Sequence, residues 1–125
     1  MSMILSTDDG LDYHVNVWNW GVLHHMVAIE NIFPEEIWEP LYYNLGYELN
    51  AEQVTILADF LETKLLPSLK AGERLFFNGT ITNEPDDGTF YRDEKDVWRN
   101  YSLHHHVLVQ IINFLRNTNG YVKFL

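Results

Sequence analysis

The chain has 125 residues, 46% of them apolar and 14% aromatic, which is typical of a folded protein of one domain spanning residues 1–125. It contains no cysteine, which excludes disulfides, zinc–thiolate sites and thiol catalysis. Its net charge of −10 disfavours nucleic acids and anionic membranes as partners and favours a cationic one.

The negative charge is concentrated in the first half of the chain. Residues 1–63 contain eleven acidic residues and no lysine or arginine, whereas residues 64–125 contain seven acidic and eight basic residues. This asymmetry indicates either a surface for a basic partner or a means of keeping the protein in solution. Because neither a secretory leader nor a long apolar stretch is present, the sequence predicts a cytoplasmic protein.

The first third of the chain predicts a hairpin, a helix and a short helical segment. Residues 3–17 alternate in polarity around a turn at Asp8-Asp9-Gly10, which predicts two paired strands. Residues 18–32 then change to helical spacing. The predicted apolar face of that helix contains Trp18, Val22, Met26 and Ile29. Prolines at 34 and 40 limit the next helix to one or two turns.

The remaining chain predicts two longer helices and further strands. Asn50 and Gln53 have the spacing of a capping box, and a helix with one apolar stripe follows them. That stripe consists of Val54, Leu57, Ala58, Leu61 and Leu65. Residues 74–82 predict a strand with a turn at Asn78-Gly79, and residues 84–88 predict a loop.

The last predicted helix begins with Asn100 or Ser102 as its cap and has one apolar face. That face contains Leu103, Val107, Ile111 and Leu115. Gly120 ends the helix, and a strand closes the chain. The predicted fold is one small α+β domain with three main helices, a short N-terminal hairpin and a C-terminal strand.

The sequence contains no motif that marks an enzyme or a cofactor site. Successive side chains on a helix point about 100° apart, so His104, His105 and His106 cannot converge on one ion. No nucleophile elbow or glycine-rich phosphate loop is present. We therefore predict no catalytic residue, no cofactor and no metal. A site shared between helices, such as His25 with His105, remains an alternative.

Aromatic and acidic residues occur together between residues 29 and 48, where lysine and arginine are absent. Aromatic rings attract cations and carboxylates bind arginine, so such a segment fits a basic protein partner. The predicted contact residues are Glu35, Glu36, Glu39 and Glu48 as charges, with Trp38, Tyr42 and Tyr43 as anchors. The alternative for these three aromatic residues is a place in the core.

Three short motifs resemble a group of small uncharacterised bacterial cytosolic proteins. The motifs are Trp18-Asn19-Trp20, the stretch from Asn50-Ala51-Glu52 to Leu61-Glu62, and Asn119-Gly120-Tyr121. In that group a second glycine usually stands where this chain has Asn119. The resemblance implies a bacterial, cytosolic single domain and assigns no functional residues.

Size, charge and the acidic aromatic segment together predict an immunity protein, which would neutralise a basic bacterial toxin such as a nuclease. An acidic inhibitor of this kind occupies the surface on which a nuclease binds phosphates. One alternative is a regulatory protein or a homo-oligomer assembled through the aromatic residues. The other is a small metal protein that uses its histidines.

Overall fold

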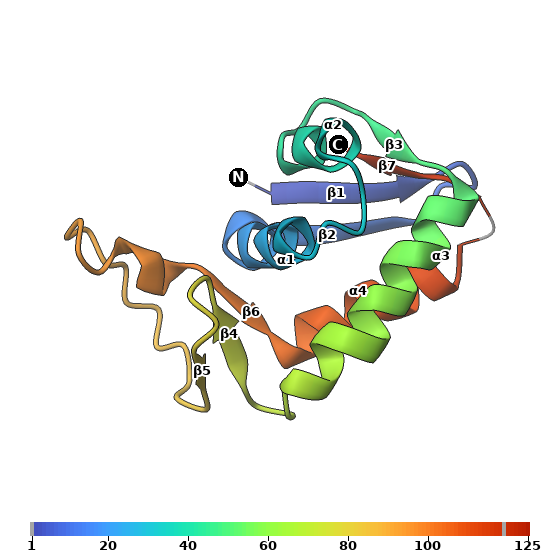
Figure 1. Cartoon of the computed structure of the whole chain (residues 1–125). Helices are drawn as coiled ribbons and strands as arrows, with labels where there is room; N and C mark the ends of the chain where they lie inside the picture. The colour runs from blue at the N-terminus through green and yellow to red at the C-terminus, as the bar shows by residue number, and fades with distance from the viewer. Residues whose placement is uncertain (1, 119) are drawn as a thin grey trace.

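The computed structural model describes residues 2–118 and 120–125. In these residues the chain forms four α-helices and two antiparallel sheets (Figure 1). The first sheet has the strand order β2-β1-β7-β3 and the second has the order β5-β4-β6. The strands are β1 (Ser2–Thr7), β2 (Asp12–Asn16), β3 (Glu48–Leu49), β4 (Arg74–Phe76), β5 (Ile81–Thr82), β6 (Ser102–His104) and β7 (Val122–Phe124). The helices are α1 (Val17–Ile29), α2 (Glu35–Trp38), α3 (Ala51–Phe60) and α4 (His105–Arg116). The predicted α+β fold is therefore confirmed.

The first sheet brings the two ends of the chain together around β1. Strands β1 and β2 form the predicted hairpin, in which Leu5 lies opposite Tyr13. Leu5 also lies opposite Phe124 of β7, and Leu49 of β3 lies opposite Val122. Since residues directly opposite in an antiparallel pair share a face, these apolar side chains form one inner surface.

Helix α1 begins one residue before its predicted range and ends three residues before the end of that range, and its buried face differs from the predicted one. It begins at Asn16, whose side-chain oxygen accepts a hydrogen bond from the Asn19 N–H at 2.9 Å. Ile29, predicted to be on the buried face, is exposed, and Trp18 is only partly buried. Eight of the thirteen residues of α1 are buried. A helix that is covered on several sides is apolar over most of its circumference. The spacing of its apolar residues therefore cannot predict which face is buried.

Helix α3 follows its prediction closely. Asn50 and Gln53 form the capping box, with bonds of 2.8 and 2.9 Å between each side chain and the other's backbone N–H. The helix continues through a π turn, Leu61–Leu65, and a 3₁₀ turn, Leu66–Ser68. All five residues of its predicted stripe are buried.

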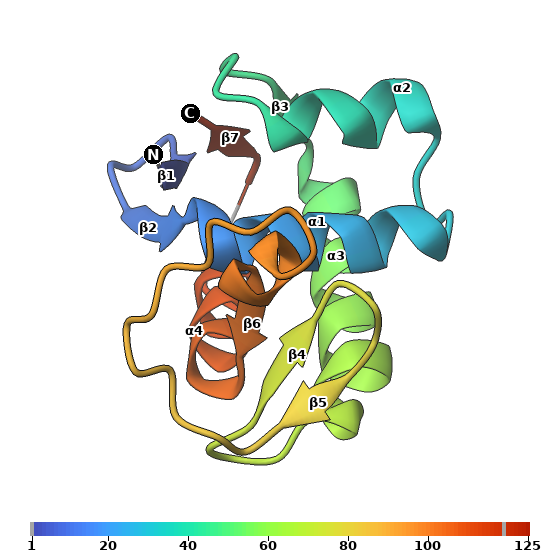
Figure 2. The ribbon, with the colours of Figure 1, turned by 90° about the vertical axis from the view of Figure 1, so that its left-hand side faces the viewer.

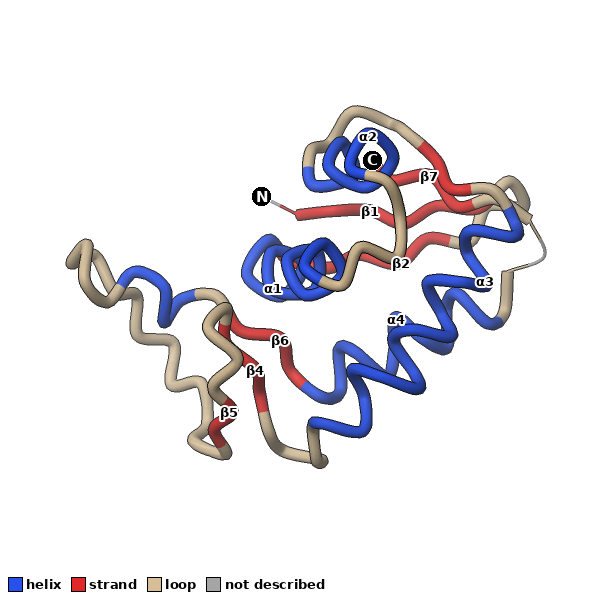
Figure 3. Tube along the Cα trace, viewed as in Figure 1, coloured by secondary structure: helices blue, strands red, loops and turns tan. Residues whose placement is uncertain are grey.

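Helix α4 begins later than predicted, because residues 102–104 form strand β6 instead of a first helical turn. Leu103 lies opposite Leu75 of β4, a pairing that only the fold brings about. Asn100 is not a helix cap, since its side chain accepts from and donates to the backbone of Tyr91, both at 2.8 Å. Between β5 and β6 the chain runs mostly as a loop with one 3₁₀ turn, Val97–Asn100 (Figure 3).

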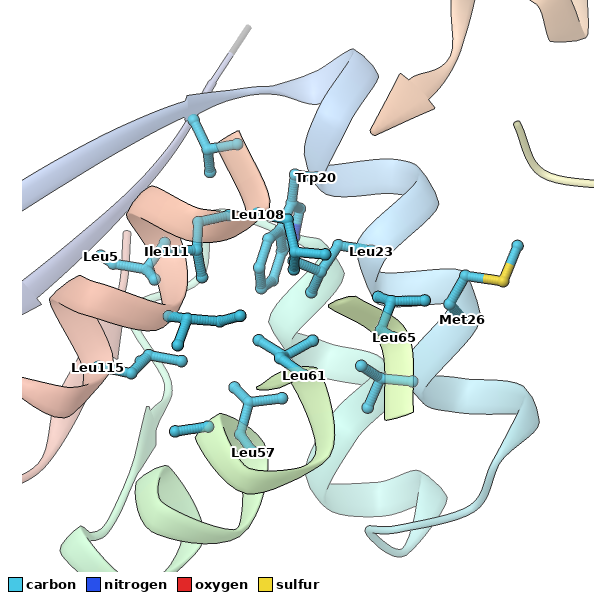
Figure 4. Close-up of a cluster of buried hydrophobic side chains, with 14 of the residues drawn as sticks. Leu5, Trp20, Leu23, Met26, Leu57, Leu61, Leu65, Leu108, Ile111 and Leu115 are labelled. Carbon is cyan, nitrogen blue, oxygen red and sulfur yellow. The ribbon is translucent and has the colours of Figure 1, made fainter. Parts of the chain in front are cut away.

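The main core lies where α1, α3 and α4 meet the first sheet. Figure 4 shows Leu5 and Ile111 beside each other in this cluster, Trp20 near its centre, and Leu57 and Leu61 pointing into it from α3 and its continuation. None of the helices in the described residues is both long enough and apolar enough to cross a membrane. The segment between α1 and β3 lies at one end of the molecule (Figure 2), and its Phe33, Trp38 and Leu41 belong to the same cluster.

Candidate protein-binding surface

The acidic part of the candidate surface is carried by α2 and the 3₁₀ turn that follows it, Glu39–Tyr42. Figure 2 shows α2 and β3 at the opposite end of the molecule from the β4–β5 hairpin. The carbonyl oxygen of Pro34 accepts hydrogen bonds from the N–H groups of Ile37 and Trp38 at 3.0 and 3.1 Å, which starts the helix. Acidic residues directly after this proline suit the positive end of a helix.

Trp38 belongs to the core, which is the alternative that the sequence left open for this residue. Its side chain is 2% exposed, and its indole N–H donates to the carbonyl oxygen of His24 at 2.9 Å. The ring stacks on His24, with centroids 4.9 Å apart, and on Phe33, with centroids 5.6 Å apart. With two stacked neighbours and its one donor satisfied, the ring fastens α2 to α1.

The two predicted tyrosine anchors differ in exposure. Tyr42 is partly buried, its ring lies edge-on to His24, and burial raises the pKa of its hydroxyl group. Tyr43 is 50% exposed and meets only the edge of Tyr42 among the rings. Of the predicted aromatic anchors, Tyr43 is therefore the one that a partner reaches most easily.

An exposed aromatic turn follows directly, and it consists of residues 43–47. Leu45 and Tyr47 are 64% and 56% exposed, so this turn contains three exposed large apolar side chains within five residues. Sequence reasoning did not name Leu45 and Tyr47 as contacts. The signal that could have indicated them is Gly46, because a glycine with polar residues nearby favours a turn at the surface.

The aromatic turn is held in place by the backbone of the first sheet. Gly46 donates its N–H to the carbonyl oxygen of Phe124 at 3.1 Å, and Phe124 donates to that of Tyr47 at 2.8 Å. The Asn44 side-chain amide donates to the carbonyl oxygens of Ser2 and Leu125, both at 2.7 Å. Gly46 has φ of +80°, a conformation that favours glycine. The exposed side chains therefore project from a fixed backbone.

Carboxylates precede and follow this turn in the chain, and most of them make no ion pair with a described residue. Glu35, Glu36, Glu39 and Glu48 are all exposed, and none makes an ion pair with another described residue. Glu48 differs from the others because it lies opposite Lys123 in the β3–β7 pairing. The three glutamates of residues 35–39 thus have the least compensated charge.

A pocket of about 300 Å³ opens beside these glutamates, between α1 and α2. It is lined by His24, Ala28, Asn31, Phe33, Glu35, Trp38 and Glu39. Its wall is aromatic and buried, whereas its two carboxylates are exposed. Sequence reasoning placed both glutamates on the surface but missed the pocket, because the lining comes from two helices and their connection.

His24 is the one buried histidine among the described residues, at 8% exposure. Its Nε2 lies 2.8 Å from the carbonyl oxygen of Trp38. Because a carbonyl oxygen can only accept a hydrogen bond, Nε2 is the donor and carries the hydrogen. Burial lowers the pKa of its imidazole, while the bond to Trp38 raises it by less. Burial therefore favours the neutral ring, and the contact with the Trp38 carbonyl places its hydrogen on Nε2.

The other histidines do not assemble into a site. His104 lies on β6 near Asp86, at 4.0 Å, and its N–H donates to the side chain of Asn19. Within residues 2–118 and 120–125, no group of three or more histidine, aspartate and glutamate side chains is placed to hold a metal ion.

The resemblance to a group of small bacterial proteins stays a prediction, since nothing in the fold tests it. Protein-family models, curated proteins and solved structures were all compared with this chain, and none of them matches it.

Proposed function

We propose that the protein is a cytoplasmic immunity protein, which binds a basic bacterial toxin through the acidic surface at residues 35–48 and blocks its activity. The observation that carries this proposal is the combination, within residues 35–48, of an exposed aromatic turn with exposed carboxylates that make no ion pair with a described residue. A solubility device would need the charges but not the exposed apolar side chains.

The two parts of the surface would contribute to different steps of binding. Carboxylates attract a basic partner over long range and raise the association rate, an effect that salt weakens. Tyr43, Leu45 and Tyr47 would then be buried in the complex and slow its dissociation. Because the backbone of the turn is already held by Phe124, little conformational entropy is lost on binding.

Affinity capture from a lysate of the source organism, at low and at high salt, tests the proposal. Support requires a basic protein that binds in a one-to-one ratio, is weakened by salt, and loses a toxic activity such as nuclease activity when this protein is added. If the captured protein keeps its activity in the complex, inhibition is the wrong function.

A charge-reversal variant locates the interface on that partner. We expect Glu35→Lys with Glu36→Lys and Glu39→Lys to weaken binding at least tenfold, mainly through slower association. The matched control is Asp12→Lys with Glu84→Lys and Glu94→Lys, which changes the net charge equally at exposed positions elsewhere. Equal losses in both variants would assign binding to overall charge and contradict the proposed surface.

Self-association is the second candidate function, because the exposed aromatic turn lies beside β3, which ends the first sheet. An edge strand offers unpaired backbone groups to a second copy. A dimer whose mass persists at high salt in light scattering, and which is lost in Leu45→Glu, would favour this candidate over a basic partner.

A further inference from the structure

The pocket between α1 and α2 combines features that go beyond a general acidic surface. Of its seven lining residues, two are exposed glutamates and three are buried aromatic or imidazole rings. Its volume of about 300 Å³ is at the lower end of the range for ligand pockets, roughly 300–1,000 Å³. It therefore has room for one extended side chain rather than for a large ligand.

Glu35 and Glu39 supply two acceptors at the opening of the pocket. They are four residues apart on consecutive helical turns, a spacing that places side chains on the same face. Neither carboxylate makes an ion pair with a described residue, so both remain available to a cation. Glu36, by contrast, is exposed but does not line the pocket.

His24 supplies a third acceptor. Its Nε2 donates to Trp38, so Nδ1 is the acceptor nitrogen of a neutral ring. No described residue forms a hydrogen bond with Nδ1. In the described structure, every side-chain nitrogen or oxygen that is fully enclosed has a hydrogen-bond partner, so an atom without a partner is not fully enclosed. Nδ1 therefore retains access to solvent, and His24 lines this pocket.

The buried rings beside these acceptors would strengthen an interaction with a cation. Phe33 and Trp38 are stacked at an interplanar angle of 21° and exclude water from one side of the pocket. Charges interact more strongly where water is excluded. A flat group also packs well against a wall of stacked rings.

We propose that this pocket binds an arginine side chain of the protein's partner. A guanidinium group is planar, always charged and carries five N–H donors, which fits two carboxylates and one imidazole nitrogen. A lysine ammonium group is compact and cannot match both a flat wall and separated acceptors. This inference rests on the proposed function only for the source of the arginine, since the pocket itself is a property of this chain.

Titration with N-acetyl-arginine methylamide, followed by NMR, tests the pocket without the partner. We expect saturable shifts at the His24 ring, the Phe33 amide and the Trp38 indole, with a Kd on the order of millimolar. The citrulline analogue has the same shape without the charge and should give no saturable shifts. The lysine analogue should bind at least fivefold more weakly. Absence of saturable shifts with the arginine compound, or equal shifts with lysine or citrulline, would overturn the proposal.

Two matched variants separate the pocket from the general acidic surface. Glu35→Gln with Glu39→Gln should weaken binding of the arginine compound at least tenfold, whereas Glu36→Gln with Glu48→Gln should change it less than twofold. Both remove two charges from exposed positions of the same surface. Equal losses in the two variants would show that net charge, not the pocket, attracts the compound.

The outcome for the pocket is distinguishable from the outcome for the proposed function. If no toxin is captured but the arginine compound binds as expected, the pocket stands and the immunity function fails. If a toxin is inhibited but the compound does not bind, the function stands and the arginine pocket is wrong.

Discussion

His24 connects the core to the candidate surface through a single side chain. One ring nitrogen is bonded to Trp38, one ring face is stacked on Trp38, and the ring also lines the pocket. Because His24 is 8% exposed, a proton on this ring would place a charge in a poorly solvated position. Its neutral form is therefore part of the folded structure.

This burial predicts that stability falls when the pH is lowered through the usual pKa of histidine, about 6.5. The pKa of His24 is lowered in the fold, so below pH 6.5 the unfolded chain binds this proton more readily than the folded one. The stability that the neutral His24 ring contributes is complete above pH 6.5, and it is lost as the pH falls towards the lowered pKa of the folded state. Urea unfolding at pH 7.5 and 5.5 measures it.

The variant His24→Gln removes the titrating group while keeping a donor for the Trp38 carbonyl. We expect the loss of stability between pH 7.5 and 5.5 to be smaller in this variant than in the unaltered protein. His14→Gln serves as the control, because it makes the same side-chain change at an exposed position. A pH dependence that is the same in all three proteins would contradict the assignment.

At the scale of elements, α2 depends on its attachment for its existence. A four-residue helix is far too short to persist alone, so tertiary contacts must maintain it. Trp38 supplies those contacts through its hydrogen bond to His24 and its stacking between His24 and Phe33. The same residue therefore positions Glu35 and Glu39 at the pocket.

Replacing Trp38 with alanine should cost about 3–5 kcal/mol of unfolding free energy, as for other large core aromatic residues. Tyr43→Ala should change it by about 0.5 kcal/mol or less, because half of that side chain is exposed. Chemical unfolding followed by circular dichroism gives both values. Similar costs for the two variants would mean that the assignment of Trp38 to the core and Tyr43 to the surface is wrong.

At the scale of the whole molecule, the charge distribution opposes folding. The net charge is −10, and the three ion pairs found among the described residues involve His104 and Arg116, both in the second half of the chain. Of the eleven acidic residues of the first half, only Asp59 and Glu62 take part in these ion pairs, both with Arg116, so most of its negative charges repel one another. Such a cost is easier to explain if a partner's positive charge relieves it.

Salt should accordingly raise the stability of the free protein. From about 0.01 M to about 0.15 M NaCl the Debye length falls from roughly 30 to 8 Å, which screens this repulsion. We expect Tm to rise by about 3–5 °C, equivalent to roughly 1 kcal/mol. Differential scanning calorimetry over this range measures the change.

Two variants, one that removes negative charges and one that removes positive charges, provide the controls for the effect of salt. Glu35→Gln with Glu36→Gln and Glu39→Gln should make the rise in Tm smaller, because fewer charges repel. Lys64→Gln with Lys70→Gln removes positive charge and should make the rise larger. A Tm that does not change with salt in any of these proteins would rule out self-repulsion as a cost.

The parts of the fold that the sequence predicted best are those encoded by neighbouring residues. The Asp8-Asp9-Gly10 turn, the capping box of Asn50 and Gln53, and the stripe of α3 depend on contacts within a few positions. The start of α4 was predicted wrongly because Ser102 and Leu103 pair with β4, far away in the chain. Local propensity cannot register a partner that only the fold brings near.

By itself, the sequence determined that the protein has an α+β fold and an acidic first half. It also showed an aromatic segment between residues 29 and 48 that contains no lysine or arginine. Charge and periodicity can be read without coordinates. Only the tertiary structure decided that Trp38 is buried while Tyr43, Leu45 and Tyr47 are exposed, and that Glu35 and Glu39 share a pocket with His24. The physical reason is that exposure depends on what packs against a side chain. The packing of α2 on α1 joins residues that no spacing rule connects.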